Sequence, residues 1–247
     1  MAKLGYLRRN NVELIICKQS TISYPLHNHV SVFTLGFILE GTIELTTDKG
    51  SKLYQENDAF LIFPYTPHYI NAKSCYTLLS LCISTDWVAN SETEKINSVV
   101  ISFLHEAINN SEVVEKIYRA FCGFILISQM IPLQKETAIS RLKTQLEMYP
   151  EHRCSIDDMS KITFISKYNL IRAFKNEVGL TPHQFQIQNR IRKAQLLLEG
   201  TATIAEAASA TGFCDQSHFI RHFGKLVGLT PTDYKLACEV TLPLPID

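Results

Sequence analysis

IRAFKNEVGLTP at residues 171–182 and IRHFGKLVGLTP at residues 220–231 are two copies of one motif. Aligned at an offset of 49 residues, they are identical at eight of twelve positions: Ile171/Ile220, Arg172/Arg221, Phe174/Phe223, Val178/Val227, Gly179/Gly228, Leu180/Leu229, Thr181/Thr230 and Pro182/Pro231. Such a fixed spacing indicates a duplicated supersecondary element. With two copies it is a tandem pair, not a solenoid.

Each copy closes a pattern of short helix, tight turn and longer helix, which is typical of a helix-turn-helix unit. The first unit is expected at about 155–178 and the second at about 203–227. A Ser or Thr followed three residues later by an acid opens each unit, and a glycine ends it. The amphipathic segment 183–198 is predicted to be a helix that joins the units and fixes their separation.

The longer helix of each unit has an inward aromatic face and an outward polar face. Arginine can bond guanine bidentately, glutamine suits adenine, an exposed isoleucine can meet a thymine methyl, and lysines suit phosphates. The expected DNA-binding residues are Lys167, Tyr168, Ile171, Arg172 and Lys175 in the first unit, and Gln216, Ser217, His218, Ile220, Arg221 and Lys225 in the second. The alternative is a pair of helical hairpins packed only for stability.

The run GFCDQSHFIRHFGKLVGLTPTDY at 212–234 carries a family resemblance. Residues 136–236 resemble the DNA-binding domain of the AraC/XylS family of bacterial transcription regulators. The resemblance implies two helix-turn-helix units on a linker helix, promoter binding that usually activates transcription, and contact with RNA polymerase. It carries recognition contacts to Tyr168, Ile171 and Arg172, and to Gln216, Ser217 and Arg221. Thr163, Ile171 and Gly224 depart from the family pattern.

The composition places few limits on the function. The 247 residues carry no net charge, and the seven cysteines are scattered without a Cys-x-x-Cys pair. This fits reduced thiols better than a disulfide framework or zinc site. The longest apolar run, FCGFILISQMI at 121–131, is shorter than the ~18 residues of a membrane span. The N-terminus lacks the apolar region of a signal peptide. We therefore expect a cytoplasmic protein with no membrane contact.

The expected fold has two domains, β then α. Short β-branched and aromatic runs separated by turn residues predict a barrel or sandwich at about 12–85, and helical spacing predicts two helices within about 92–131. Residues 1–131 then form a ligand-sensing and dimerisation domain, 132–136 a linker, 137–236 the DNA-binding domain and 237–247 a tail.

The second of the two helices before the linker has more than one apolar stripe. One interpretation is that it forms the seam of a homodimer. The other is that it is an internal core helix packed on the sheet.

HNH at 27–29 and FPYTPH at 63–68 give residues of about 20–85 a weaker resemblance to cupin-type sensor domains. In metal-binding cupins an HxH is followed closely by a Glu, and a later His completes the site. His27, His29 and His68 match three of those positions, and the carboxylate is absent. The interpretation we favour is that these histidines and Tyr65 line or cap a ligand pocket through hydrogen bonds, without a metal or cofactor.

Three functions follow from these patterns. The first is a DNA-binding regulator, expected to be an activator, controlled by a small molecule in the barrel. The second is a regulator whose N-terminal half only dimerises or binds a protein. The third is a cupin metalloenzyme fused to helices. The sequence shows no nucleophile triad, paired catalytic carboxylates or phosphate-binding glycine loop. We therefore expect no enzymatic activity and no catalytic residues.

Overall fold

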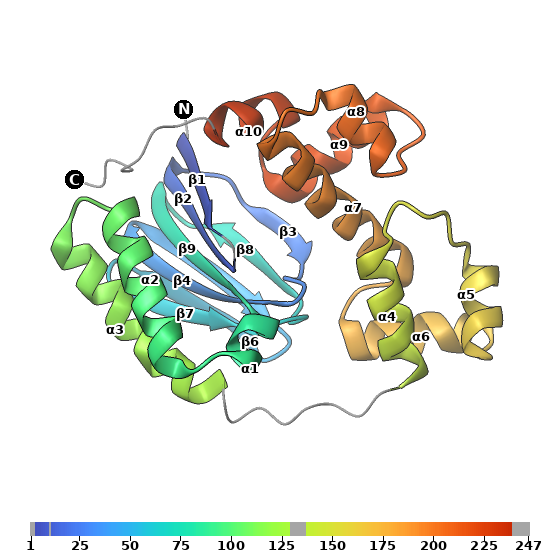
Figure 1. Cartoon of the computed structure of the whole chain (residues 1–247), viewed down its shortest axis with the longest axis horizontal. Coiled ribbons are helices and arrows are strands. Elements are labelled where there is room, and N and C mark those ends of the chain that lie inside the picture. The colour runs from blue at the N-terminus through green and yellow to red at the C-terminus, as the bar shows by residue number, and fades with distance from the viewer. Residues whose placement is uncertain (1–2, 10, 129–136, 239–247) are drawn as a thin grey trace.

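The computed structural model describes residues 3–9, 11–128 and 137–238. Figure 1 shows a strand-rich N-terminal lobe with helices against one side and a wholly helical C-terminal lobe on the other side. The predicted order, β then α, is therefore confirmed. The predicted linker at 132–136 lies outside the described residues.

The described strands of the N-terminal lobe form two antiparallel sheets. The five-stranded sheet has the order β1 (Lys3–Arg9), β2 (Val12–Ser20), β9 (Tyr76–Ser84), β4 (Val32–Glu40), β7 (Ala59–Ile62). The four-stranded sheet has the order β3 (Tyr24–His27), β8 (His68–Ala72), β5 (Thr42–Thr47), β6 (Gly50–Gln55). A buried cluster that includes Ile38, Ile43 and Ile70 draws residues from both sheets, so the sheets face each other across a shared core.

The outer face of the five-stranded sheet is covered by α1 (Thr85–Asn90), α2 (Thr93–Ala107) and α3 (Ser111–Ser128). The two helices predicted within 92–131 are confirmed, and α1 is a short addition. Phe121 and Phe124 of α3 pack into the sheet-side core. The opposite side of α3 carries the ion pairs Glu112–Lys116 and Glu115–Arg119.

Seven described helices form the C-terminal lobe: α4 (Ala138–Met148), α5 (Ile156–Thr163), α6 (Lys167–Val178), α7 (Pro182–Glu199), α8 (Ile204–Ala210), α9 (Gln216–Val227) and α10 (Pro231–Cys238). The pairs α5/α6 and α8/α9 are the predicted helix-turn-helix units, and α7 is the predicted joining helix. Each unit has its own buried cluster. Phe185 near the start of α7 belongs to the first cluster, and Ile191 and Leu198 belong to the second.

The shared Gly-Leu-Thr-Pro ends one helix and begins the next. Gly179 and Gly228 are left-handed C-caps with φ of 82° and 81°. Thr181 caps the start of α7, and Pro182 occupies its first turn, where a missing N–H costs nothing. In the second copy the same arrangement starts α10.

Two expected boundaries were wrong. Strand β1 lies before the predicted start of the barrel at residue 12 and pairs along its length with β2. Helix α10 was not predicted, and it runs to Cys238, inside the segment assigned to the tail. The two elements pack together, with the rings of Tyr6 and Tyr234 5.7 Å apart.

The lobes dock through the glycines that end the two recognition helices. Gly179 lies so close to Pro67 that an added Cβ would be 1.8 Å from the proline Cγ. At Gly228 an added Cβ would lie 3.1 Å from the ring of Tyr24. The N-terminal lobe therefore touches both helix-turn-helix units at equivalent positions of the repeat.

The cysteines and the helices agree with the sequence on two smaller points. All seven cysteines are free thiols. Within the described residues, no helix is both long enough and apolar enough to cross a bilayer.

Candidate functional site

Helix α6 separates its two faces as the sequence predicts. Leu170 and Phe174 are fully buried in the core of the first unit. On the outward side, the exposed fraction is 75% for Tyr168 and 39% for Ile171, and Arg172 is also exposed. Apolar side chains exposed beside an arginine suit a surface that meets DNA bases better than one that meets only water.

Helix α9 repeats the arrangement with different outward residues. Phe219 and Phe223 are buried at positions equivalent to Leu170 and Phe174. The outward residues Gln216, Ser217, Ile220, Arg221 and Lys225 are all exposed. Asp215 caps the helix by accepting a hydrogen bond of 2.7 Å from the backbone N–H of His218. The two helices are therefore fixed to equivalent scaffolds while presenting different groups.

Two of the expected DNA contacts are engaged within the protein. His218 is half-buried, and its Nε2 lies 2.9 Å from Nε2 of His222 on the next turn of α9. The ring of His218 also meets the ring of Phe213 edge-on. Lys167, at the start of α6, forms an ion pair with Asp157 of α5. His218 must turn away from His222, and Lys167 from Asp157, before either can contact DNA.

A cavity with a volume of about 240 Å³ lies between the lobes. Strands β1, β2, β4 and β9 of the five-stranded sheet and β3 and β8 of the other sheet line it on one side, and α7, α9 and α10 line it on the other. The residues with polar chemistry in its lining are Arg8, Glu13, Cys17, Tyr24, His27, Asn28, His29, Ser80, Cys82, Gln188, Arg192, Gln195, Glu199 and Tyr234. The sequence placed the ligand inside the barrel, whereas this cavity is closed by the DNA-binding lobe.

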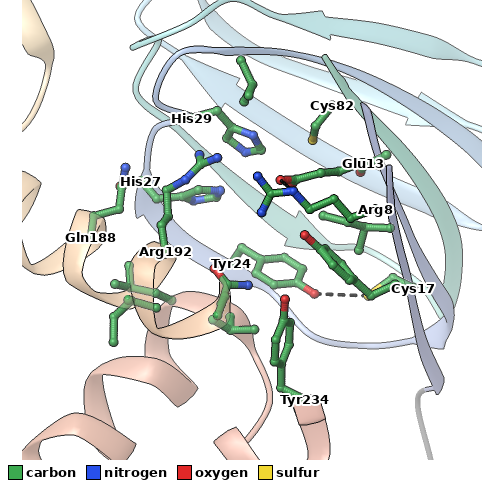
Figure 2. Close-up of a pocket in the computed structure, with 18 of the residues that line it drawn as sticks. Arg8, Glu13, Cys17, Tyr24, His27, His29, Cys82, Gln188, Arg192 and Tyr234 are labelled. Atoms are coloured by element: carbon green, nitrogen blue, oxygen red, sulfur yellow. Dashed lines mark hydrogen bonds and ion pairs between the residues drawn. The ribbon is translucent and has the colours of Figure 1, made fainter. Parts of the chain in front are cut away.

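Of the two arginines that line the cavity, Arg8 has acidic partners and Arg192 has none within ion-pairing distance among the described residues. Nε of Arg8 lies 3.4 Å from a carboxylate oxygen of Glu13, and its Nη1 lies 3.9 Å from Glu199. Tyr234 donates a hydrogen bond of 3.0 Å to Glu199, and burial raises the pKa of that carboxyl. Figure 2 shows Arg8 and Arg192 reaching from opposite lobes toward the same space.

A buried amide network joins the lobes beside the cavity. The side-chain N–H of Gln188 donates to the backbone oxygen of Asn28 at 2.8 Å and to its side-chain oxygen at 2.7 Å. The Asn28 backbone N–H donates to Gln188 at 3.2 Å, and its side chain donates to the Val178 carbonyl at 2.8 Å. Every polar group of this contact is thus matched across the interface.

Three of the four expected ligand residues come together. The ring centroids of His27, His29 and His68 are 4.2–5.4 Å apart. Tyr65 lies elsewhere, on the loop between β7 and β8. Its hydroxyl donates to Glu147 of α4 at 2.7 Å, and it does not line the cavity. Tyr65 is a contact between the lobes, because its positive φ of 62° turns this loop toward α4.

Burial sets the protonation of the histidine cluster. It lowers the pKa of His27 and His29, and it lowers the pKa of His68 to about 3, with a contribution from neighbouring His27. All three imidazoles are therefore neutral near pH 7.

The sequence analysis missed Arg8, Glu13, Gln188, Arg192 and Glu199. One signal was available for Gln188. It lies three residues from both Phe185 and Ile191, on the apolar stripe of α7, and it is buried. A polar residue on an apolar stripe needs a buried partner. The charged residues carried no such signal, because they face one another only after the lobes dock.

Comparison with known proteins matches the C-terminal lobe to a family described as a helix-turn-helix domain, over residues 159–237. The transcriptional regulator YbfI of Bacillus subtilis is 27% identical over 228 residues, which cover 79% of this chain and 81% of YbfI. A Haemophilus influenzae regulator of the same type is 24% identical over 84% of this chain and 68% of its own length. The matched domain and these relatives support the resemblance to the AraC/XylS family of transcription regulators.

Other similarities of this chain are partial or structural. LumQ of Photobacterium leiognathi, a probable transcriptional regulator, is 30% identical over 116 residues, which span about half of each protein, 44% of this chain and 47% of LumQ. The crystal structure of ToxT from Vibrio cholerae superposes with a TM-score of 0.65 at 14% identity, covering 94% of this chain and 100% of ToxT. That likeness supports the two-lobe fold over the whole chain.

Proposed function

We propose that this regulator binds promoter DNA through α6 and α9, each reading a separate major groove. The observation that carries the proposal is the pair of capped helix-turn-helix units with exposed Tyr168, Ile171 and Arg172 on one and Gln216, Ser217 and Arg221 on the other. Two grooves on one face of B-DNA are about 34 Å apart, one turn of the duplex. A single chain would then read two adjacent half-sites.

We also propose that a small carboxylic acid occupies the cavity between the lobes and controls DNA binding. Arg192 lines the cavity, is partly buried, and supplies a cation without an acidic partner within ion-pairing distance among the described residues. An anionic ligand would pair with it by a charge-assisted hydrogen bond. The volume of about 240 Å³ is near the lower end of ligand pockets, so the effector is small. One ToxT structure holds an unsaturated fatty acid, and another holds a naphthalenyl-butenoic acid.

The position of the cavity suggests how the ligand acts. One wall belongs to the N-terminal lobe, and the other includes α7, which joins the two DNA-reading units. A ligand that binds one relative arrangement of the lobes more tightly than another shifts the population toward that arrangement.

Further assignments complete the proposal. Residues 1–131 sense the effector and form a homodimer, and 137–236 bind DNA. The protein acts in the cytoplasm as a non-enzymatic activator in contact with RNA polymerase.

Binding-site selection from random duplexes tests the DNA proposal: enriched sites should contain two half-sites one helical turn apart. Retention of all sequences alike would contradict it.

Lys167→Ala should weaken binding to selected and scrambled duplexes by the same factor. A lysine on a phosphate releases a counterion, so its removal should also reduce the slope of log affinity against log salt by about 1. Fluorescence anisotropy between 50 and 200 mM salt measures both effects, with Lys116→Ala on α3 as the control. A loss confined to the selected sequence would mean that Lys167 reads a base.

Arg192→Ala should reduce the binding free energy of a carboxylic acid by about 1.5–3 kcal/mol, because it removes one hydrogen bond to a charged group. The naphthalenyl-butenoic acid should raise the melting temperature of the wild-type chain, and its primary amide should raise it less. Lys193→Ala is the matched control, because Lys193 is the next residue of α7, pairs with Glu151 and does not line the cavity. An equal response of Arg192→Ala and wild type would contradict the role of Arg192.

A further inference from the structure

His27, His29 and His68, the histidine cluster, have ring nitrogens that could act as metal ligands. His27 and His68 are directly opposed in the pairing of β3 with β8, and His29 follows in the turn after β3. One ring nitrogen from each of the three lies within 4.8 Å of the others. Among the described residues, no other group of three or more His, Cys, Asp or Glu side chains has this spacing.

The second nitrogen of each ring is already held. Nδ1 of His27 lies 2.7 Å from the Pro25 carbonyl oxygen, and Nδ1 of His68 lies 2.9 Å from the Thr66 carbonyl oxygen. A carbonyl only accepts, so both Nδ1 atoms carry the proton and both Nε2 atoms carry a lone pair. Nδ1 of His29 is 2.6 Å from the Thr34 hydroxyl, which holds the third ring in place and leaves its Nε2 free of that bond.

Nε2 of His68 accepts no hydrogen bond from any described residue. The side chain of His68 is fully buried. Buried polar atoms are almost always paired, so an unpaired one needs an explanation. Neutral imidazoles that donate through Nδ1 to a carbonyl and present Nε2 to a common point have the arrangement that protein metal ligands adopt.

We propose that Nε2 of His27, His29 and His68 bind one divalent transition-metal ion of the zinc class. Imidazole suits Zn²⁺, Cu²⁺, Fe²⁺ and Ni²⁺, and three protein ligands leave one position open. Zinc–nitrogen bonds of about 2.0–2.1 Å require the nitrogens to lie roughly 3.4 Å apart in a tetrahedron, so the rings close slightly on binding. This proposal stands independently of DNA binding.

The open position points to an anionic fourth ligand. His27 and His29 line the cavity between the lobes, and Arg192 faces the same space. Glu13, the carboxylate labelled in Figure 2, is paired with Arg8. A carboxylate or water that enters from the cavity can therefore complete the coordination, whereas the protein supplies three nitrogens only.

The test uses the full chain after removal of metal with EDTA, titrated with Zn²⁺ or Co²⁺. We expect one equivalent to bind, and Co²⁺ to give the strong visible absorption of a four-coordinate site. His68→Asn should weaken binding at least about tenfold, with folding checked by circular dichroism. The spectrum of wild-type protein decides the question even if that variant does not fold.

A second histidine pair provides the control. His218 and His222 on α9 offer two nitrogens that are already close and partly exposed. The double variant His218→Asn/His222→Asn should keep the equivalent of bound Co²⁺ and its spectrum. No binding by wild type, a six-coordinate spectrum, or loss of binding in this double variant would overturn the proposal.

Discussion

Arg172→Ala and Arg221→Ala together should remove about 2–6 kcal/mol of binding free energy for the selected duplex. Each exposed arginine is placed to form one bidentate guanine contact, worth about 1–3 kcal/mol of discrimination. The residues lie in separate units with separate cores, so their effects should add. Anisotropy titrations of the single and double variants measure the losses.

Arg119→Ala is the control for these titrations, because Arg119 is an exposed arginine on α3 that pairs with Glu115. It should leave the affinity for the selected duplex unchanged. If one single variant binds the selected duplex as tightly as wild type, the corresponding helix does not read a base through its arginine.

Gly179→Ala should destabilise the chain by roughly 2–5 kcal/mol. A residue with a side chain costs about 1–2 kcal/mol in the left-handed conformation of Gly179. Its Cβ would also lie 1.8 Å from the Pro67 ring, and overpacking costs about 1–3 kcal/mol more. Urea denaturation measures the change in the free energy of unfolding.

Gly228→Ala separates the two causes. It has the same φ within one degree, but its nearest contact is 3.1 Å, to the ring of Tyr24. It should therefore lose the conformational part alone, about 1–2 kcal/mol. Equal losses in the two variants would show that Pro67 does not press against Gly179 in solution, and that the lobes are not docked as described.

The helix-turn-helix units were predictable because their determinants are local. The capping pairs Ser155/Asp158 and Thr203/Glu206 lie three residues apart, and Gly179 and Gly228 follow directly on the helices they end. These residues act on the nearby backbone, so sequence spacing alone carries the information.

The two missed elements depend on context that spacing does not show. The sequence of β1, KLGYLRR, has no β-branched residue and forms a strand because β2 supplies its partners. Pro231 follows the glycine that ends α9 and cannot continue that helix. At the first turn of α10 the same proline favours a helix, because its fixed φ suits that position.

The histidine cluster was predicted in part, and the cavity was not. Resemblance placed His27, His29 and His68 together, but the direction of each Nδ1 depends on carbonyls and a hydroxyl that only the folded chain brings near. Arg8 and Arg192 are 184 positions apart, and they share a cavity because the lobes dock. Tyr65 was misplaced for the same reason, since its partner Glu147 belongs to the other lobe.

Tyr6 and Tyr234 bring the first and the last described elements of the chain, β1 and α10, into contact. The lobes also meet where Gln188 bonds Asn28 and where Tyr65 bonds Glu147. All of these contacts join parts of one chain, so the docking of the lobes is intramolecular and does not depend on the protein concentration.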